Sequence, residues 1–300
     1  MKHTAKITLI LVAVFLLAQF VGLLVIDQYI DKEATEATGV TQFKDLPLNM
    51  ERPEIEESQS YWFIIAAVLI GTILVLLLVR FRGAKLWKFW FFIAATLCLT
   101  MAFAAFMNQT IAFIVSFGLS FYKVFRSNFY VHNFTEIFLY GGLAAIFVPI
   151  MNLTAAIIVL LFIAVYDAFA VWQSKHMVKM AKFQSDSKVF AGLMIPYSLK
   201  DLKAQAAAHK TKLKKHVNGL KKVAVKSRTA ILGGGDIGFP LLFAGVVLKT
   251  TPMLKVLIIP IVTAVALFLL LYFAKKDKFY PAMPFLTAGC LIGYLIVWLI

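Results

Sequence analysis

The sequence of residues 153–172 is LTAAIIVLLFIAVYDAFAVW, an apolar stretch with one charged residue, Asp167. A helix that crosses a bilayer needs about 20 such residues, because the hydrocarbon core is about 30 Å thick and a helix rises about 1.5 Å per residue. The whole chain has this character: of its 300 residues, 61% are apolar and 15% are charged. Soluble domains average about 45–50% and about 25%, and no soluble core could bury so much apolar surface. We therefore predict a polytopic membrane protein with an all-α fold.

Stretches of this kind recur along the chain and predict nine transmembrane helices. They span residues 7–26, 61–79, 87–107, 110–122, 134–149, 153–172, 229–247, 253–273 and 281–300. The fourth and fifth have short or ambiguous ends. The first resembles a signal peptide, but it is long for one and lacks a small-residue cleavage site, so we expect it to be retained.

The positive charges predict how the chain is oriented in the membrane. Cytoplasmic loops of membrane proteins carry an excess of Lys and Arg. If the N-terminus is cytoplasmic, 25 of the 30 Lys and Arg residues fall in cytoplasmic segments and 5 fall outside. We therefore expect a cytoplasmic N-terminus and an external C-terminus. The net charge of +15 then reflects topology, and we expect no nucleic-acid partner.

The loops divide the chain into three predicted parts. These are an N-terminal membrane half at 1–172 with an acidic outer loop at 27–60, a basic cytoplasmic loop at 173–228, and a C-terminal membrane part at 229–300.

Two carboxylates lie deep within the predicted spans, Asp167 in the sixth and Asp236 in the seventh. A carboxylate inside a span is costly, so by default it indicates function; the alternative is a buried hydrogen-bonding group that joins helices. Counted along their helices, both lie about 9–10 Å inside the cytoplasmic boundary. Consecutive antiparallel helices can therefore bring them face to face. A third acid, Glu136, lies near the inner end of the fifth span, where we expect it to reach the interface.

A close pair of carboxyl groups has a specific chemistry. The two groups share a proton, because like charges in a poorly solvated site cannot both ionise. The ionised member can take a proton from water while the other polarises a peptide carbonyl, as in aspartyl proteases. Base and acid roles belong to the pair and cannot be assigned to either residue. Three glycines before Asp236 loosen the start of its helix and let another backbone approach closely; tight helix packing is the alternative.

Three short motifs include these residues. They are Tyr166-Asp167, Gly233-Gly234-Gly235-Asp236 and Pro281-Ala282-Met283-Pro284. In order and spacing they resemble the YD, GxGD and PALP motifs of the presenilin and signal peptide peptidase family of intramembrane aspartyl proteases. Met283 replaces the Leu of PALP, which is a nearly volume-conserving change. The resemblance is strongest from about residue 160 onward, whereas residues 1–150 match in topology alone.

The resemblance implies a presenilin-like fold and a protease that cuts peptide bonds within transmembrane helices at a cytoplasmic-side active site. Asp167 and Asp236 would be the catalytic pair, with no metal and no cofactor. Tyr166, the three glycines and the segment from Pro281 to Pro284 would shape the site and contact the substrate.

The resemblance also carries expectations about partners and location. A cytoplasmic N-terminus places the chain on the presenilin side of the family, which favours transmembrane substrates of type I orientation. The short loops are most like those of an archaeal presenilin homologue. We therefore expect a multi-pass protein of the cell membrane that acts alone or as a homo-oligomer within the lipid bilayer, without an obligatory partner subunit.

Two segments of the basic loop have predicted structure. Residues 189–196 are apolar and lie where the family has a loop segment near its active site. They either add a strand to an unwound substrate or form an amphipathic helix on the membrane surface. Residues 199–226 are rich in Ala and Lys and predict a helix.

Other catalytic motifs do not occur in the sequence. None of the five His residues lies in His-Glu-x-x-His, and neither Gly-x-Ser-x-Gly nor Gly-x-x-x-x-Gly-Lys-Ser/Thr is present. Cys98 and Cys290 lie in apolar stretches without metal-ligand spacing. The remaining alternative is a secondary transporter or channel that uses Asp167 and Asp236 as a proton or cation relay. Such carriers usually contain inverted repeats, which this sequence does not show.

Overall fold

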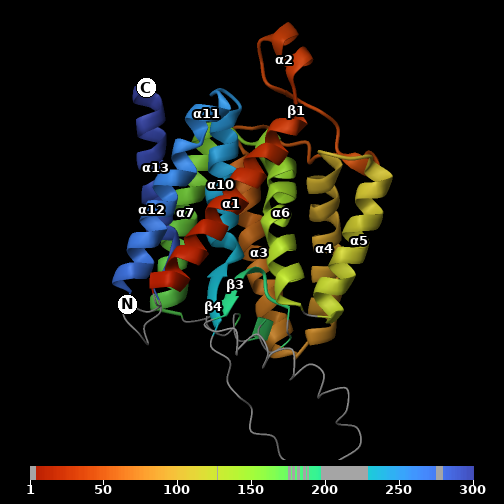
Figure 1. Cartoon of the computed structure of the whole chain (residues 1–300), viewed down its shortest axis with the longest axis vertical. Helices are drawn as coiled ribbons and strands as arrows, with labels where there is room; N and C mark the ends of the chain where they lie inside the picture. Colours follow the sequence, from red (N-terminus) through yellow and green to blue (C-terminus); the bar gives the residue numbers. More distant parts are fainter. Residues whose placement is uncertain are drawn as a thin grey trace, which may run out of the picture.

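The computed structural model describes residues 5–126, 128–174, 189–196, 229–274 and 280–300, together with the single positions 177, 180, 183, 184 and 187. In this part of the chain the long helices run side by side in one bundle (Figure 1). The helices are α1 (Ala5–Tyr29), α2 (Lys32–Thr38), α3 (Ser60–Arg80), α4 (Ala84–Ala104), α5 (Gln109–Arg126), α6 (Phe129–Phe147), α7 (Leu153–Trp172), α10 (Gly234–Leu248), α11 (Met253–Val256), α12 (Ile258–Phe273) and α13 (Met283–Leu299). The remaining elements are the strands β1 (Ile30–Asp31), β2 (Gln42–Phe43), β3 (Gly192–Pro196) and β4 (Thr229–Gly233), and the 3-10 turns η1 (Pro47–Asn49) and η2 (Val148–Ile150).

Each of the nine stretches predicted to span the membrane overlaps at least one of these helices. Within the described ranges, six segments are long and apolar enough to cross a bilayer: α1, α3, α4, α6 with η2, α7, and α11 with α12. α10 and α13 are apolar but shorter, with 15 and 17 residues. A helical polytopic fold is therefore confirmed, whereas the count of nine spans stays a prediction. α1 begins and α13 ends at opposite ends of the bundle (Figure 1), but the side of the membrane that each end faces also stays a prediction.

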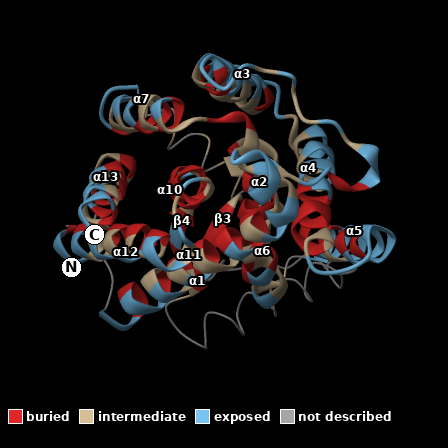
Figure 2. Cartoon of the chain, turned by 90° about the horizontal axis from the view of Figure 1, so that it is seen from above, coloured by how far each residue is buried: buried red, intermediate tan, exposed pale blue. Residues whose placement is uncertain are grey.

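α10 lies in the interior of the bundle, surrounded by α1, α6, α7, α12 and α13 (Figure 2). Every residue from Pro240 to Leu248 is buried, as expected for a helix that is apolar on all its faces. Glycines let the neighbouring helices approach it closely. A Cβ added to Gly22 of α1 would lie 2.3 Å from the Leu241 side chain, so no larger residue fits there without a shift. This central helix carries one of the two predicted catalytic acids at its start.

The first five residues of the seventh predicted span form strand β4 instead of a helix. β4 pairs with β3 in antiparallel register, with Gly192 opposite Gly233. The β-branched residues Thr229 and Ile231 favour a strand, and the glycines that follow are poor helix formers. Both two-stranded sheets, β1–β2 and β3–β4, are small additions to the predicted all-α fold.

The pairing bears on one of the two expectations for the basic loop. The amphipathic surface helix considered for residues 189–196 is wrong, because residues 192–196 are β3. The helix predicted for residues 199–226 lies outside the described residues.

The outer loop is held to the bundle at one end of α10. Lys249 Nζ donates hydrogen bonds to Glu57 at 2.8 Å and to the Met151 carbonyl at 3.0 Å. The Thr41 hydroxyl donates to the Lys249 carbonyl at 2.5 Å. These contacts tie the loop to the end of α10 that is opposite β4.

Candidate active site

Asp236 lies at the start of α10, directly after β4. The chain leaves the strand at Gly233, whose extended backbone (φ −66°, ψ 150°) is the N-cap of the helix. Asp236 is the third residue of α10, so the count along a helix from residue 229, on which its predicted depth rests, is wrong. Its Oδ2 accepts a hydrogen bond from the Gly233 N–H at 3.3 Å. A carboxylate is stabilised in this position because the first N–H groups of a helix lack partners and carry partial positive charge.

Asp167 lies in the last two turns of α7 and faces the start of α13. Its Oδ2 accepts a hydrogen bond from the Met283 N–H at 3.0 Å, and the Ala282 N–H is also directed at this carboxyl group. Both are N–H groups at a helix start, where partners within the helix are missing. Asp167 is 5% exposed and Asp236 is 8% exposed, so both carboxyl groups lie inside the bundle.

The two acids lie on helices that pack against each other, α7 and α10. Neither is neutralised by an ion pair among the described residues, where the pairs present are Lys32 with Asp27, Lys123 with Glu136, and Lys249 with Glu57. The fold thus places on neighbouring helices two buried acids that are 69 positions apart in the sequence.

Comparison with known proteins identifies the family. The model of a family described as signal-peptide peptidase, presenilin aspartyl protease matches residues 21–300. The chain belongs to this family. A presenilin-family fold is also found in two solved structures, each titled as a presenilin family intramembrane aspartate protease. For the first structure the TM-score is 0.60 and the sequence identity 17%, and the match covers 97% of this chain and 98% of the solved chain. For the second the TM-score is 0.57 and the identity 17%, and the match covers 99% of this chain and 97% of the solved chain. Among curated proteins, none matches the chain significantly.

Membership of the presenilin family, together with several membrane-spanning helices, makes the chain an integral, multi-pass membrane protein. The resemblance that the three sequence motifs predict is therefore confirmed at the level of the family. The likeness to the two solved structures shows the fold alone, because their sequences are only 17% identical to this one.

In this presenilin-family chain, the Tyr166 hydroxyl is directed to α3. It donates a hydrogen bond to Thr72 Oγ1 at 3.0 Å, and the ring stacks on Phe162 of its own helix at 6.1 Å. Tyr166 is thus the neighbour of Asp167 in the sequence, but its hydroxyl links α7 to α3. This contact positions the helix that carries Asp167.

The glycines before Asp236 differ in what surrounds them. A Cβ added to Gly234 would lie 2.7 Å from Tyr140 Oη, which is too close for an ordinary contact. A Cβ added to Gly235 would lie 3.6 Å from the Phe239 ring, an ordinary van der Waals distance. Packing against α6 therefore requires glycine at 234, whereas nothing in the described surroundings requires it at 235.

The segment from Pro281 to Pro284 lies beside Asp167. Pro281 and Met283 are buried, and Ala282 and Pro284 are half-buried. α13 begins at Met283, so the predicted start of this helix at residue 281 is two residues too early. The N–H of Met283, the first residue of α13, donates to the Asp167 carboxyl group, so this segment is joined directly to α7.

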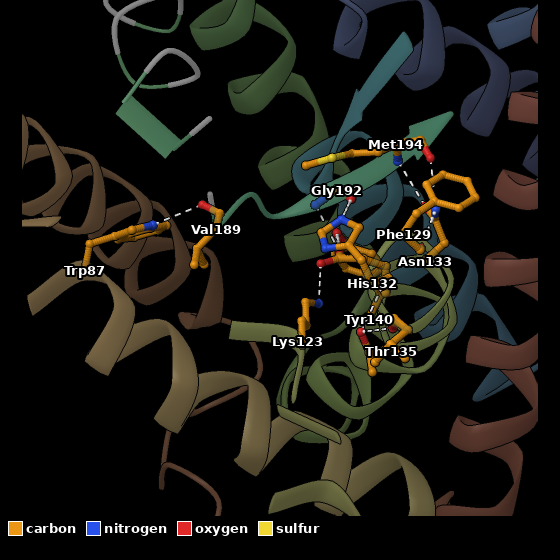
Figure 3. Close-up of polar contacts among 12 residues, drawn as sticks. Trp87, Lys123, Phe129, His132, Asn133, Thr135, Tyr140, Val189, Gly192 and Met194 are labelled. Carbon is orange, nitrogen blue, oxygen red and sulfur yellow. Dashed lines mark hydrogen bonds and ion pairs between the residues drawn. The ribbon is translucent and has the colours of Figure 1, made fainter. Parts of the chain in front are cut away.

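Among the described residues a third acid, Glu136 of α6, is also buried. The prediction that it reaches the membrane interface is wrong, because the residue has no exposed surface. Its carboxylate forms an ion pair with Lys123 of α5 at 2.5 Å and accepts hydrogen bonds from Tyr140 Oη and from the Gly192 N–H, the latter at 3.0 Å (Figure 3). Lys123 is itself buried and is not a cation of a solvated loop. Opposite charges in consecutive apolar stretches are the signal from which this pair could have been found.

Three side chains of α6 cover one edge of β3 (Figure 3). Asn133 Nδ2 donates to the Met194 carbonyl at 2.9 Å, and Asn133 Oδ1 accepts from the Met194 N–H at 3.0 Å. His132 Nε2 lies at 2.8 Å from the Gly192 carbonyl oxygen, and Glu136 accepts the Gly192 N–H. Backbone groups of successive strand residues point to opposite edges, so the intervening residues of β3 face β4.

No group of three or more His, Cys, Asp or Glu side chains with the geometry of a metal site occurs in the part of the chain that the structure describes.

Proposed function

We propose that the chain is an intramembrane aspartyl endopeptidase with Asp167 and Asp236 as its catalytic pair. The observation that carries the proposal is the pair itself: two buried carboxyl groups on packed helices, each oriented by a backbone N–H at a helix start. Membership of a family of aspartyl proteases supports protease activity. A transporter that relays protons or cations through the same residues is not favoured, because neither the family nor the fold is that of a carrier.

In the proposed reaction one carboxyl is ionised and the other carries the shared proton. The carboxylate accepts a proton from a water molecule, whose oxygen attacks the peptide carbonyl carbon, while the neutral carboxyl gives its proton to the carbonyl oxygen. The resulting diol collapses as the C–N bond breaks: one hydroxyl of the diol gives its proton to the carboxylate of the pair, and the amine nitrogen takes up a proton from the neutral carboxyl. One shared proton then remains on the pair, as at the start. The N–H groups of Gly233 and Met283 fix the orientation of the two carboxyl groups during these transfers.

The β3–β4 ribbon suggests how a substrate reaches this pair. α6 covers the outer edge of β3, so the ribbon edge to which neither another strand nor an α6 side chain is bonded among the described residues belongs to β4. There, the alternation of the antiparallel pairing directs the backbone groups of Ile231 and Gly233 away from β3. The Gly233 N–H already points to Asp236. We propose that an unwound segment of the substrate adds to this edge as a strand, which places a peptide bond beside the acids.

The orientation of the site follows from the charge distribution. The end of α7, the start of α10 and the β3–β4 ribbon lie at the end of the bundle where α1 begins (Figure 1). The excess of Lys and Arg predicts that this end is cytoplasmic. A cytoplasmic-side site and a cytoplasmic N-terminus suit transmembrane substrates of type I orientation. We further propose that the protein acts alone or as a homo-oligomer in the bilayer, without an obligatory partner subunit.

The proposal is tested by incubating the purified protein, in detergent and in liposomes, with a synthetic helical transmembrane peptide. We expect cleavage by the wild type and loss of cleavage in both Asp167→Ala and Asp236→Ala. Asp45→Asn is the matched control, because Asp45 is an exposed acid of the outer loop. Equal cleavage by wild type and Asp236→Ala contradicts the protease proposal. Ion-driven uptake into the same liposomes that either Asp variant abolishes would support a transporter instead.

A further inference from the structure

α6 acts toward β3 as a neighbouring strand would. Four backbone groups of the strand, two on Gly192 and two on Met194, are hydrogen-bonded to side chains of one helix (Figure 3). His132 and Glu136 are four positions apart, and so share a helix face with Asn133 beside them. A sliding strand would have to break all four bonds, because the side chains that accept and donate them cannot move with it.

The same face of α6 also contacts the start of α10. The Tyr140 hydroxyl donates to Glu136 and lies against Gly234, which is the first residue of α10 and two positions before Asp236. The Gly234 N–H in turn donates to the Ala191 carbonyl at 3.1 Å. Glu136 is therefore connected to β3 through the Gly192 N–H and to the start of α10 through Tyr140.

The Glu136 carboxylate that holds β3 is buried, and its charge is balanced by a buried lysine. Lys123 of α5 provides the charge that compensates Glu136, and both side chains are almost fully enclosed, at 2% and 0% exposure. A buried ion pair adds little stability compared with apolar residues of similar volume, but it specifies one arrangement of its partners because each alternative leaves a buried charge unpaired. The burial of this pair next to β3 therefore favours a role in fixing geometry.

The geometry points to Asn133, His132 and Glu136 as positioning residues that set the register of the β3–β4 ribbon and, through it, the peptide bond of the substrate that is cut. This inference rests on the proposed protease function and on addition of the substrate to β4. A shift of an antiparallel strand by one residue reverses the face of every side chain. A loosened ribbon would therefore present neighbouring peptide bonds of the substrate to the same pair of acids.

The test compares Asn133→Ala with Asn128→Ala. Asn133 holds β3, whereas Asn128 is on the same helix and only caps its start through the Tyr130 N–H at 2.9 Å. Products of a transmembrane peptide are identified by mass spectrometry, which reports the position of each cut. We expect Asn133→Ala to change the ratio of products cut at neighbouring positions by roughly threefold to tenfold, because the loss of ordinary hydrogen bonds changes a preference by about this factor. Asn128→Ala should keep the wild-type ratio.

A second readout does not depend on activity. Hydrogen exchange of the segment 189–196 should accelerate by about tenfold in Asn133→Ala and stay unchanged in Asn128→Ala. If Asn133→Ala does not fold, His132→Ala replaces it in the same two measurements. Of the four hydrogen bonds to β3, this variant removes the one to the Gly192 carbonyl.

The outcomes separate this inference from the proposed function. A wild type that cleaves nothing contradicts the protease function and, with it, this role. An active Asn133→Ala or His132→Ala protein with wild-type product ratios contradicts the positioning role alone, even if its total activity is lower. Hydrogen exchange of the segment 189–196 at the wild-type rate in Asn133→Ala also contradicts the positioning role.

Discussion

At the scale of single residues, three acids are buried in the part of the protein that the structure describes, and their partners separate their roles. Glu136 has its carboxylate oxygens occupied by Lys123, by Tyr140 and by a backbone N–H of β3. Asp167 and Asp236 instead lie on neighbouring helices, and within the described residues the hydrogen bonds that their carboxyl groups accept come from backbone N–H groups. A carboxylate neutralised by a buried lysine is a structural group, whereas an uncompensated pair is suited to exchange a proton.

Removing one partner of the buried ion pair should be more damaging than removing both charges. We expect Glu136→Ala to lower the free energy of unfolding by about 3–5 kcal/mol, because Lys123 is left buried without a partner. The double variant Lys123→Met/Glu136→Gln should lose less than Glu136→Ala alone, since no buried charge remains. Denaturant titration in detergent measures both values. A double variant that loses as much stability as Glu136→Ala would refute the coupling.

The two glycines at the start of α10 should differ in their tolerance of a methyl group. Gly234→Ala should lower the free energy of unfolding by about 1–3 kcal/mol, because its Cβ meets the Tyr140 hydroxyl that Glu136 holds in place. Gly235→Ala should not lower it, since the position has room and alanine favours a helix by up to about 1 kcal/mol. Thermal unfolding of the two variants side by side provides the measurement. The reverse order of stabilities would show that the packing of this turn is described wrongly.

At the scale of elements, local sequence accounts for the helices better than for the ribbon. The apolar stretches predict the helices because a membrane-spanning helix depends on its own residues. β4 is different, since its strand state depends on β3, and 32 residues of chain separate Pro196 from Thr229. The pairing of Lys123 with Glu136 is equally non-local, joining α5 to α6. Asp167 and Asp236 could be found from sequence because an acid within an apolar span is conspicuous whatever its partners are.

The two edges of β4 should respond differently to proline. Ile231→Pro removes an N–H that points away from β3, so we expect the protein to stay folded while kcat/KM for a transmembrane peptide falls by roughly fivefold to tenfold. Leu232→Pro removes an N–H that faces β3 and should reduce stability as well. Kinetics and thermal unfolding of the two variants distinguish these effects. An Ile231→Pro protein with wild-type kcat/KM would exclude substrate addition at this edge.

At the scale of the whole molecule, α10 is enclosed by the other helices, and the acids lie at the end of the bundle where α1 begins (Figures 1 and 2). The distribution of Lys and Arg predicts that this end faces the cytoplasm. Both acids are buried, at 5% and 8% exposure, so the proposed catalytic pair lies inside the bundle.

The orientation can be measured with cysteine labels. Cys98 and Cys290 are buried, so a membrane-impermeant maleimide should leave the folded wild type unlabelled. In intact cells, Val40→Cys in the outer loop should be labelled, and Lys85→Cys at the start of α4 should be labelled only after permeabilisation. The two positions are exposed, and each serves as the control for the other. The opposite pattern would invert the topology and remove the basis for expecting type I substrates.

The central claim is that Asp167 and Asp236 together hydrolyse a peptide bond within a transmembrane helix. It is tested most directly by the masses of the fragments that the purified protein produces from one synthetic transmembrane peptide. We predict paired fragments from the wild type and Asp45→Asn, whose masses add up to the peptide plus one water, and no such fragments from Asp167→Asn or Asp236→Asn. The same fragments formed at the wild-type rate by either of these two variants would contradict the account.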